Sequence, residues 1–303
     1  MNFNTFHILS NLEGWIEKIS RRGYLKLTRE STMILPLAIL ISALALGPAA
    51  KPISDAGDSS GIRVVPVPRT PEPATSLLTI AVPEPGKMLN NPVWIQFRVE
   101  GYALGADSQF DRADEVANSK MGQTIHVVID NYPYFPINEP AIDPFDEQGY
   151  YYYQSYKFEV PYQLDEGVHT IRIFPARSFG ESLKGERVFH STFFYLGSQD
   201  GGTPVDLSKP YLTYNEPSDQ FYLQEGKPVL LDFFLTNCEL SQDGYKVKVT
   251  IDGKSSRMVT SWQPYYIYGL KRGDHTVRLQ LLDSQNKQVS GPFNDVERTF
   301  TVN

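Results

Sequence analysis

Two histidines and an aspartate are the side chains of this sequence whose chemistry best suits metal-assisted hydrolysis. His126 and Asp130 lie four positions apart in an apolar segment, and His190 lies in a later one. Imidazole and carboxylate groups bind zinc and act as general bases. Four residues of extended strand span about 13 Å, which is too far to share one ion unless the strand bulges. A hydrolase using His126, Asp130 and His190 is therefore an alternative interpretation only.

The other pair of histidines occupies matching places in the two halves of the chain. His169 begins an apolar alternation with Ile171, and His275 begins one with Val277. Such a ring can bind a metal or act as a base, or it can pack at the core edge and bond a loop carbonyl. Recurrence in both halves favours the second role, which is a folding role.

Further catalytic motifs are weak. Asp107, Asp111, Asp114 and Glu115 crowd one loop but lack the glycine and spacing of a calcium loop, so a solvated loop is expected. Cys238 is the single cysteine and has no evident basic partner. The sequence contains neither a Gly-x-Ser-x-Gly motif nor a phosphate-binding glycine loop. We therefore expect no cofactor and no enzyme.

Aromatic clusters offer a different chemistry, that of ligand contact. The segments 132–136 and 150–153 flank an acidic, proline-rich insertion, and 262–268 is a shorter parallel. Exposed tyrosine provides rigid contact area with a polar end, which suits a sugar, a peptide or another protein. The predicted ligand-binding side chains are Tyr132, Tyr134, Tyr151, Tyr153 and Trp262. The alternative, in which these rings cover the rim of a sandwich, stays open.

The elements that position these residues are predicted to be strands. Val93, Ile95, Phe97 and Val99 alternate with polar residues, as in a half-buried strand. The segment 125–129 repeats this pattern, with His126, Val128 and Asp130 expected to face outward. Further strands are expected around 158–160, 171–173 and 189–196.

The second half of the chain repeats the first. Four segments match in the same order: 91–97 with 227–233, 127–130 with 249–252, 167–172 with 273–278, and 186–189 with 297–300. This order predicts a tandem duplication. Units of about 100 residues with many short strands are typical of immunoglobulin-like sandwiches.

Several of these motifs carry a resemblance. A strand that ends in Ile251-Asp252-Gly253, followed by Gly-x-His-Thr-Val at 273–277, resembles the immunoglobulin-like or fibronectin-type modules of bacterial envelope proteins. The segments 122–126, 174–177 and 281–302 extend the similarity, which covers roughly 76–303. It implies an all-β fold of two tandem immunoglobulin-like sandwiches, at 76–197 and 208–303. It implies no reaction, because such modules serve as spacers, adhesins or accessory domains.

The remaining segments are expected to be linkers between domains or a signal for export. Residues 51–75 are rich in proline and predict an extended, solvated linker, and 197–207 predict a link between the domains. The segment Ser20–Lys26 resembles a twin-arginine export signal through Arg21 and Arg22. The uncharged run Met33–Ala50 follows and predicts a cleaved signal peptide, with an uncleaved anchor as the alternative.

Composition limits the partners. The net charge is −7, and an acidic chain is a poor nucleic-acid binder because phosphates attract basic surfaces. We therefore expect a non-catalytic protein exported to the periplasm or cell surface, which binds or scaffolds a glycan or an envelope protein. Only its N-terminal segment would contact the membrane, as an inner-membrane anchor if it is not cleaved. A purely structural spacer is the third interpretation.

Overall fold

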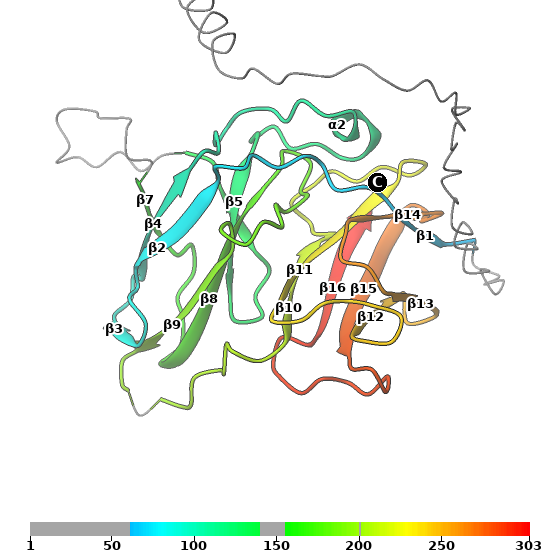
Figure 1. Ribbon diagram of the computed structural model, residues 1–303. Helices are drawn as coiled ribbons and strands as arrows, with labels where there is room; N and C mark the ends of the chain where they lie inside the picture. Colours follow the sequence, from blue (N-terminus) through cyan, green and yellow to red (C-terminus); the bar gives the residue numbers. More distant parts are fainter. Residues whose placement is uncertain (1–60, 140–154, 200) are drawn as a thin grey trace, which may run out of the picture. The chain divides into compact units, whose positions relative to one another are not determined.

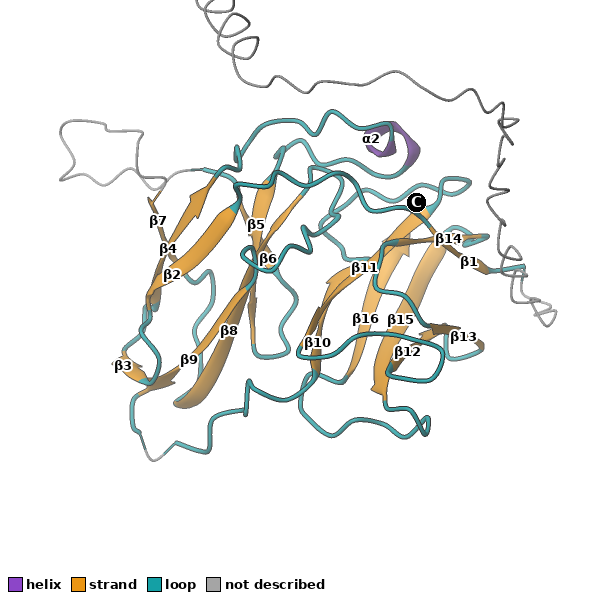
Figure 2. Cartoon of the chain, viewed as in Figure 1, coloured by secondary structure: helices purple, strands orange, loops and turns teal. Residues whose placement is uncertain are grey.

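The structure, a computed structural model, describes residues 61–139, 155–199 and 201–303. Within these residues the chain forms strands β1–β16 and a single short helix, α2 (Arg112–Glu115), so the predicted all-β class is confirmed (Figure 2). None of the described segments is a helix long and apolar enough to cross a membrane. Arg21, Arg22 and the run Met33–Ala50 lie outside the described residues.

Two sheets form a sandwich from the first part of the chain, which we call the N-terminal sandwich. Its three-stranded sheet has the order β2-β4-β7, and its five-stranded sheet the order β3-β9-β8-β5-β6. All pairs are antiparallel except β3 with β9. The strands are β2 (Leu77–Val82), β3 (Lys87–Leu89), β4 (Trp94–Glu100), β5 (Thr124–Ile129), β6 (Phe135–Ile137), β7 (Ser155–Glu159), β8 (Gly167–Ala176) and β9 (His190–Leu196).

Two further sheets form the C-terminal sandwich. Their orders are β1-β14-β11-β10 and β13-β12-β15-β16, and every pair is antiparallel. The strands are β1 (Arg63–Pro66), β10 (Tyr211–Glu216), β11 (Val229–Thr236), β12 (Lys246–Ile251), β13 (Ser255–Val259), β14 (Tyr265–Tyr268), β15 (Gly273–Leu282) and β16 (Asp295–Val302). The stretch between β9 and β10 contains no strand among its described residues.

The strand order is that of an immunoglobulin-like sandwich. Strands β3 and β1 each lie at the edge of a sheet and are left out of the following count. In each sandwich the first, second and fifth of the remaining strands share one sheet (β2-β4-β7 and β10-β11-β14). The other four strands form the second sheet (β6-β5-β8-β9 and β13-β12-β15-β16). This separation of consecutive strands between two sheets is the immunoglobulin pattern. The recurrence of one order agrees with the tandem duplication, which itself stays a prediction.

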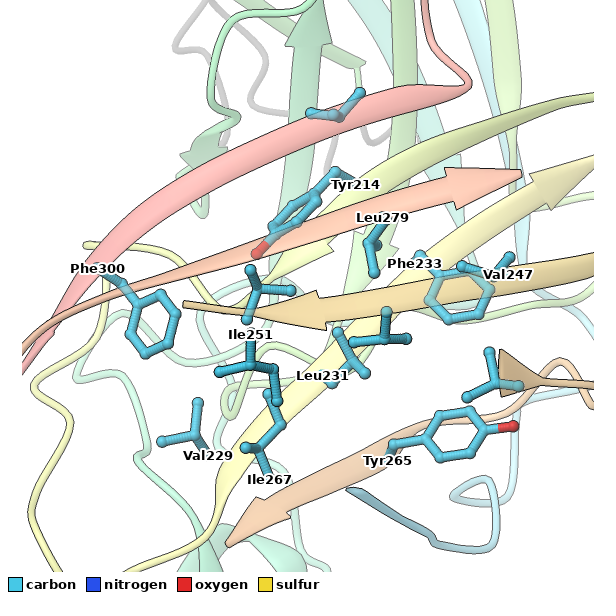
Figure 3. Close-up of a cluster of buried hydrophobic side chains, with 14 of the residues drawn as sticks. Tyr214, Val229, Leu231, Phe233, Val247, Ile251, Tyr265, Ile267, Leu279 and Phe300 are labelled. Carbon is cyan, nitrogen blue, oxygen red and sulfur yellow. The ribbon is translucent and has the colours of Figure 1, made fainter. Parts of the chain in front are cut away.

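Each sandwich has its own apolar core, which the alternation of its strands supplies. In the N-terminal sandwich Ile95, Phe97 and Val99 of β4 face Ile125 and Val127 of β5, all of them fully buried. Figure 3 shows the C-terminal core, where side chains of β11 and β14 point toward those of β12, β15 and β16. Burial of this kind contributes about 25 cal/mol for each Å² of apolar surface removed from water.

Four strands are buried on both faces, which is unlike an isolated sandwich. Every residue of β5 and of β10 is buried, and so is almost every residue of β8 and β11. One set of side chains enters the local core, and the other packs against the neighbouring sandwich. His126 and Val128 therefore have the predicted orientation, away from their own core, but they face protein and not solvent.

The expectation of a solvated linker does not hold for residues 62–72. Residues 63–66 form β1, which pairs with β14 and completes a sheet of the C-terminal sandwich (Figure 1). Ile62 and Val64 pack against that sandwich's core. We call residues 62–72 the strap, because they run from this sheet to the N-terminal sandwich. Proline suits an edge strand, where a missing N–H costs least.

Candidate functional site

The layer between the two sandwiches centres on a buried ion pair. Lys184 Nζ, in the loop after β8, lies 2.5 Å from Asp232 Oδ1 on β11, and both side chains are almost fully buried. Ser182 donates its Oγ and its backbone N–H to Asp232 Oδ2, at 2.6 and 3.1 Å. Lys184 also donates to Ser182 Oγ at 2.9 Å. Buried charges need such additional partners to offset the loss of water.

Asn215 extends this network to His126. Its Nδ2 donates to Asp232 Oδ2 at 2.8 Å and to Gly180 O at 2.7 Å, so its Oδ1 must face the histidine. His126 Nδ1 lies 2.6 Å from that oxygen and therefore carries the proton. Burial lowers the pKa of His126 to about 4, so the ring is neutral at physiological pH.

Tyr134 and Glu216 form the next part of the layer. The Tyr134 ring stacks on His126, with centroids 3.7 Å apart and planes 8° from parallel. Its hydroxyl donates to Glu216 Oε1, and Ser218 Oγ lies 3.0 Å from the other carboxyl oxygen. Burial raises the pKa of Glu216 to about 8, so this carboxyl is mostly protonated at neutral pH.

Arg172 crosses the layer from β8 to β10. Its side chain is fully buried and donates to Thr213 Oγ1 at 3.0 Å and to the carbonyl oxygens of Leu212 and Asp130. The guanidinium carbon lies 3.8 Å from the ring centroid of Phe293. Burial lowers the pKa of Arg172 to about 9, which leaves the group charged at neutral pH.

The strap is fastened by a second buried ion pair. Arg112 of α2 pairs with Glu181 and donates to Pro68 O at 2.6 Å. Glu181 also accepts the N–H of Thr70 at 2.8 Å. Glu72, at the end of the strap, accepts the backbone N–H groups of Lys184 and Gly185 at 2.7 and 2.8 Å. The strap is thus connected to the loop that carries Lys184.

An aromatic cluster covers the other side of the layer. Phe189 of the N-terminal sandwich stacks on Phe234 of β11, with centroids 4.3 Å apart. Trp262 contacts Phe234 edge-on at 4.9 Å and donates its Nε1 to Phe233 O at 2.9 Å. Such pairs add about 0.5–1.5 kcal/mol each beyond the area they bury. Polar and aromatic contacts together join the two sandwiches.

The two matching histidines each lie within hydrogen-bond distance of a loop carbonyl, as the folding interpretation predicts. His169 Nε2 lies 2.8 Å from Asp165 O, a loop carbonyl, and Nδ1 lies 2.7 Å from Asp130 Oδ2. His275 repeats both contacts, with Lys271 O at 2.8 Å and Asp252 Oδ2 at 2.9 Å. In each case the aspartate also accepts the next backbone N–H. The hydrogen bond with Asp130 raises the pKa of His169.

The three predicted ligand-binding residues that the structure describes do not gather on one surface. Tyr132 is exposed and lies beside Tyr162, with ring centroids 5.2 Å apart. Tyr134 is buried in the layer between the sandwiches, and Trp262 is partly buried there. Tyr151 and Tyr153 lie outside the described residues. For Tyr134 and Trp262 the rings fill an internal interface, a role that the sequence alternation alone does not reveal.

The alternative hydrolase site is not assembled either. His126 contacts Asn215, Asp130 contacts His169, and His190 Nδ1 lies 3.4 Å from the backbone N–H of Ile80. In the described part of the chain, no group of three or more His, Cys, Asp or Glu side chains is arranged to hold a metal ion. The acidic side chains of the loop at 105–120 are exposed, as expected. Arg112 among them is buried, which was not expected.

The residues that sequence reasoning missed are Asp232, Lys184, Asn215, Glu216, Arg172 and the pair Arg112–Glu181. One signal was present. The run Val229–Leu235 is apolar at six of its seven positions, which indicates a strand buried on both faces. Asp232 interrupts this run and could have been identified as a buried charge that needs a partner.

No protein-family model matches the sequence, and no curated protein matches it. Among solved structures, it is similar to the fibronectin(III)-like modules of Clostridium thermocellum CbhA, with 11% identity over 75% of this chain and 94% of that one, at a TM-score of 0.26. Dimeric latent PorU from Porphyromonas gingivalis shows 15% identity over 76% of this chain and 20% of that one, at 0.24. Bacteroides ovatus SGBP-B, solved with a mixed-linkage heptasaccharide, shows 13% identity over 74% and 47%, at 0.19. Likenesses this distant carry no functional argument.

Proposed function

We propose that the chain is an exported, non-catalytic protein of the cell envelope that presents its two sandwiches as one rigid body for binding or scaffolding. The observation that supports this most is the buried layer in which Lys184 pairs with Asp232 across the two sandwiches. An ion pair that is buried and hydrogen-bonded across two sandwiches resists hinge motion, because opening it would leave each charge without its partner.

The partner we propose is a glycan or an envelope protein. The test is retention of the full-length chain, purified in detergent, on separated cell-wall glycan and membrane-protein fractions. Retention on either fraction, and its loss on heat unfolding, would support the proposal. A folded chain that neither fraction retains would contradict it and leave the purely structural spacer.

Export is proposed through the twin-arginine-like segment. In a bacterial host with that pathway, the double substitution Arg21→Lys and Arg22→Lys should keep the protein in the cytoplasm, while Lys18→Arg should leave export unchanged. Export of both variants alike would contradict the twin-arginine route. Cleavage after the apolar run is read separately, from the mass of the exported chain.

A further inference from the structure

A groove of about 670 Å³ opens where the strap meets α2 and β14. Its volume lies in the range of small-molecule sites, about 300–1,000 Å³. The strap provides residues 67–71, the loop of α2 provides Phe110, Asp111, Arg112 and Glu115, and the C-terminal sandwich provides Pro228, Tyr266 and Tyr268. Both sandwiches therefore contribute to it, so its shape depends on their docking.

Rigid aromatic rings form one wall. Tyr266 donates its hydroxyl to Glu115 Oε2 at 2.5 Å and accepts from Arg112 Nε at 3.1 Å, which fixes the ring. Tyr268 lies edge-on to it, with centroids 6.0 Å apart. Phe110 packs in the same apolar cluster. Tyr266 itself is buried, so the apolar area open to a ligand comes from the partly buried Tyr268 and Phe110. Such fixed rings offer this area at little entropic cost and suit the C–H face of a sugar.

Carboxylates form the polar rim. Asp111 is exposed and precedes α2, and its carboxylate makes no capping hydrogen bond to that helix. Glu115 is exposed as well and holds Tyr266 through one oxygen. Carboxylate oxygens accept hydroxyl donors strongly. Next to the rings, these acceptors suit a ligand with both an apolar face and hydroxyl groups.

The charges around the groove favour a neutral ligand. The guanidinium of Arg112 lies 5.6 Å from the Tyr266 centroid, and that of Arg63 lies 5.2 Å from the Tyr268 centroid. Each ring therefore already has a cation, and a cationic ligand would be repelled by it. Two arginines, Arg69 and Arg112, and two carboxylates, Asp111 and Glu115, line the groove, so an ionic ligand of either sign would meet like charges there. We propose that this groove binds a neutral sugar ring of a glycan.

This inference rests on the proposed binding function and names its ligand class. The test is calorimetric titration of the full-length chain in detergent with cellohexaose, chitohexaose, laminarihexaose, mannohexaose and solubilised cell-wall glycan. Tyr268→Ala should weaken the binding of the preferred glycan about tenfold or more, and Asp111→Asn about fivefold. Matched controls are Tyr222→Ala and Asp219→Asn, which change exposed residues that do not line this groove and should leave affinity unchanged.

Three results would overturn the proposal. The first is that none of the five glycans binds. The second is that binding survives both groove substitutions, for instance while Tyr132→Ala abolishes it. The third is that polylysine binds in the groove in place of the glycans. In each case retention on a membrane-protein or glycan fraction reports separately on the proposed binding function, so failure of the groove and failure of that function are distinguishable.

Discussion

Lys184 and Asp232 form an ion pair that joins the two sandwiches, with Nζ 2.5 Å from Oδ1 and side chains 1% and 0% exposed. Taking both charges out of water costs several kcal/mol each, and only close contact and further hydrogen bonds offset this cost. Ser182 and Asn215 supply those bonds. The pair therefore disfavours any docking of the sandwiches in which either charge lacks its partner.

Removal of one member should destabilise the protein strongly. Asp232→Ala leaves Lys184 charged and buried, and it should lower the free energy of unfolding by about 3–5 kcal/mol in urea titrations. The control is Glu225→Ala, which breaks the exposed pair with Lys271 at 3.6 Å and should change stability by less than about 1 kcal/mol. Equal effects of the two substitutions would contradict the role given to the buried pair.

Glu216 should make stability depend on pH. Its pKa is 4.5 before burial and about 8 in the fold, so its contribution is complete below pH 4.5 and is lost as the pH rises to 8. Glu216→Gln stays neutral and should be the more stable form above pH 8, by on the order of 5 kcal/mol at about 1.4 kcal/mol per pKa unit. Unfolding midpoints measured from pH 4 to 9 test this. Parallel curves for the two proteins would refute it.

His169 should titrate above its usual range. Its hydrogen bond with Asp130 raises its pKa, so the stability it contributes is present below about pH 6.5 and lost as the pH rises through the raised value. Asp130→Asn should move the pKa back toward 6.5, as seen in the ring signals by NMR. The His275 ring, which contacts Asp252, serves as the control, and its signals should not move. An unshifted His169 in the variant would show that Asp130 is not the cause.

The strap should contribute to the stability of the fold as a core strand does. Val64 packs against the C-terminal core, so Val64→Asp places an unpaired charge there and should cost about 2 kcal/mol or more. Ala74→Asp introduces the same side chain at an exposed position of the same proline-rich segment and should be nearly neutral. If both substitutions were harmless, residues 63–66 would behave as a linker and not as a strand.

The alternation of apolar and polar residues predicted the strands well, because it shows which side chains face the core of their own sandwich. Ile95, Phe97 and Val99 are buried and Arg98 is exposed, as their parity indicates. The same reasoning placed His126 on the correct face of β5. It could not show that this face meets a second sandwich, because period-two patterning does not distinguish solvent from a polar interface.

The buried polar layer between the sandwiches could not be predicted from the sequence for a different reason. Tyr134 contacts Glu216 and His126 contacts Asn215 across more than 80 positions of sequence, and no local pattern joins them. The strap was misjudged because its prolines are typical of linkers, whereas an edge strand also tolerates them. In contrast, the contact of His169 with a loop carbonyl could be predicted, because a histidine recurs at the matching position, His275.

We propose that the two sandwiches form one rigid body. The most direct test is the distribution of distances between spin labels at Glu100→Cys and Lys254→Cys in the full-length chain, with Cys238→Ser to remove the native thiol. We predict one narrow distribution, which broadens when Asp232→Ala is added. A broad distribution before that substitution would show a hinge between the sandwiches and contradict a rigid body.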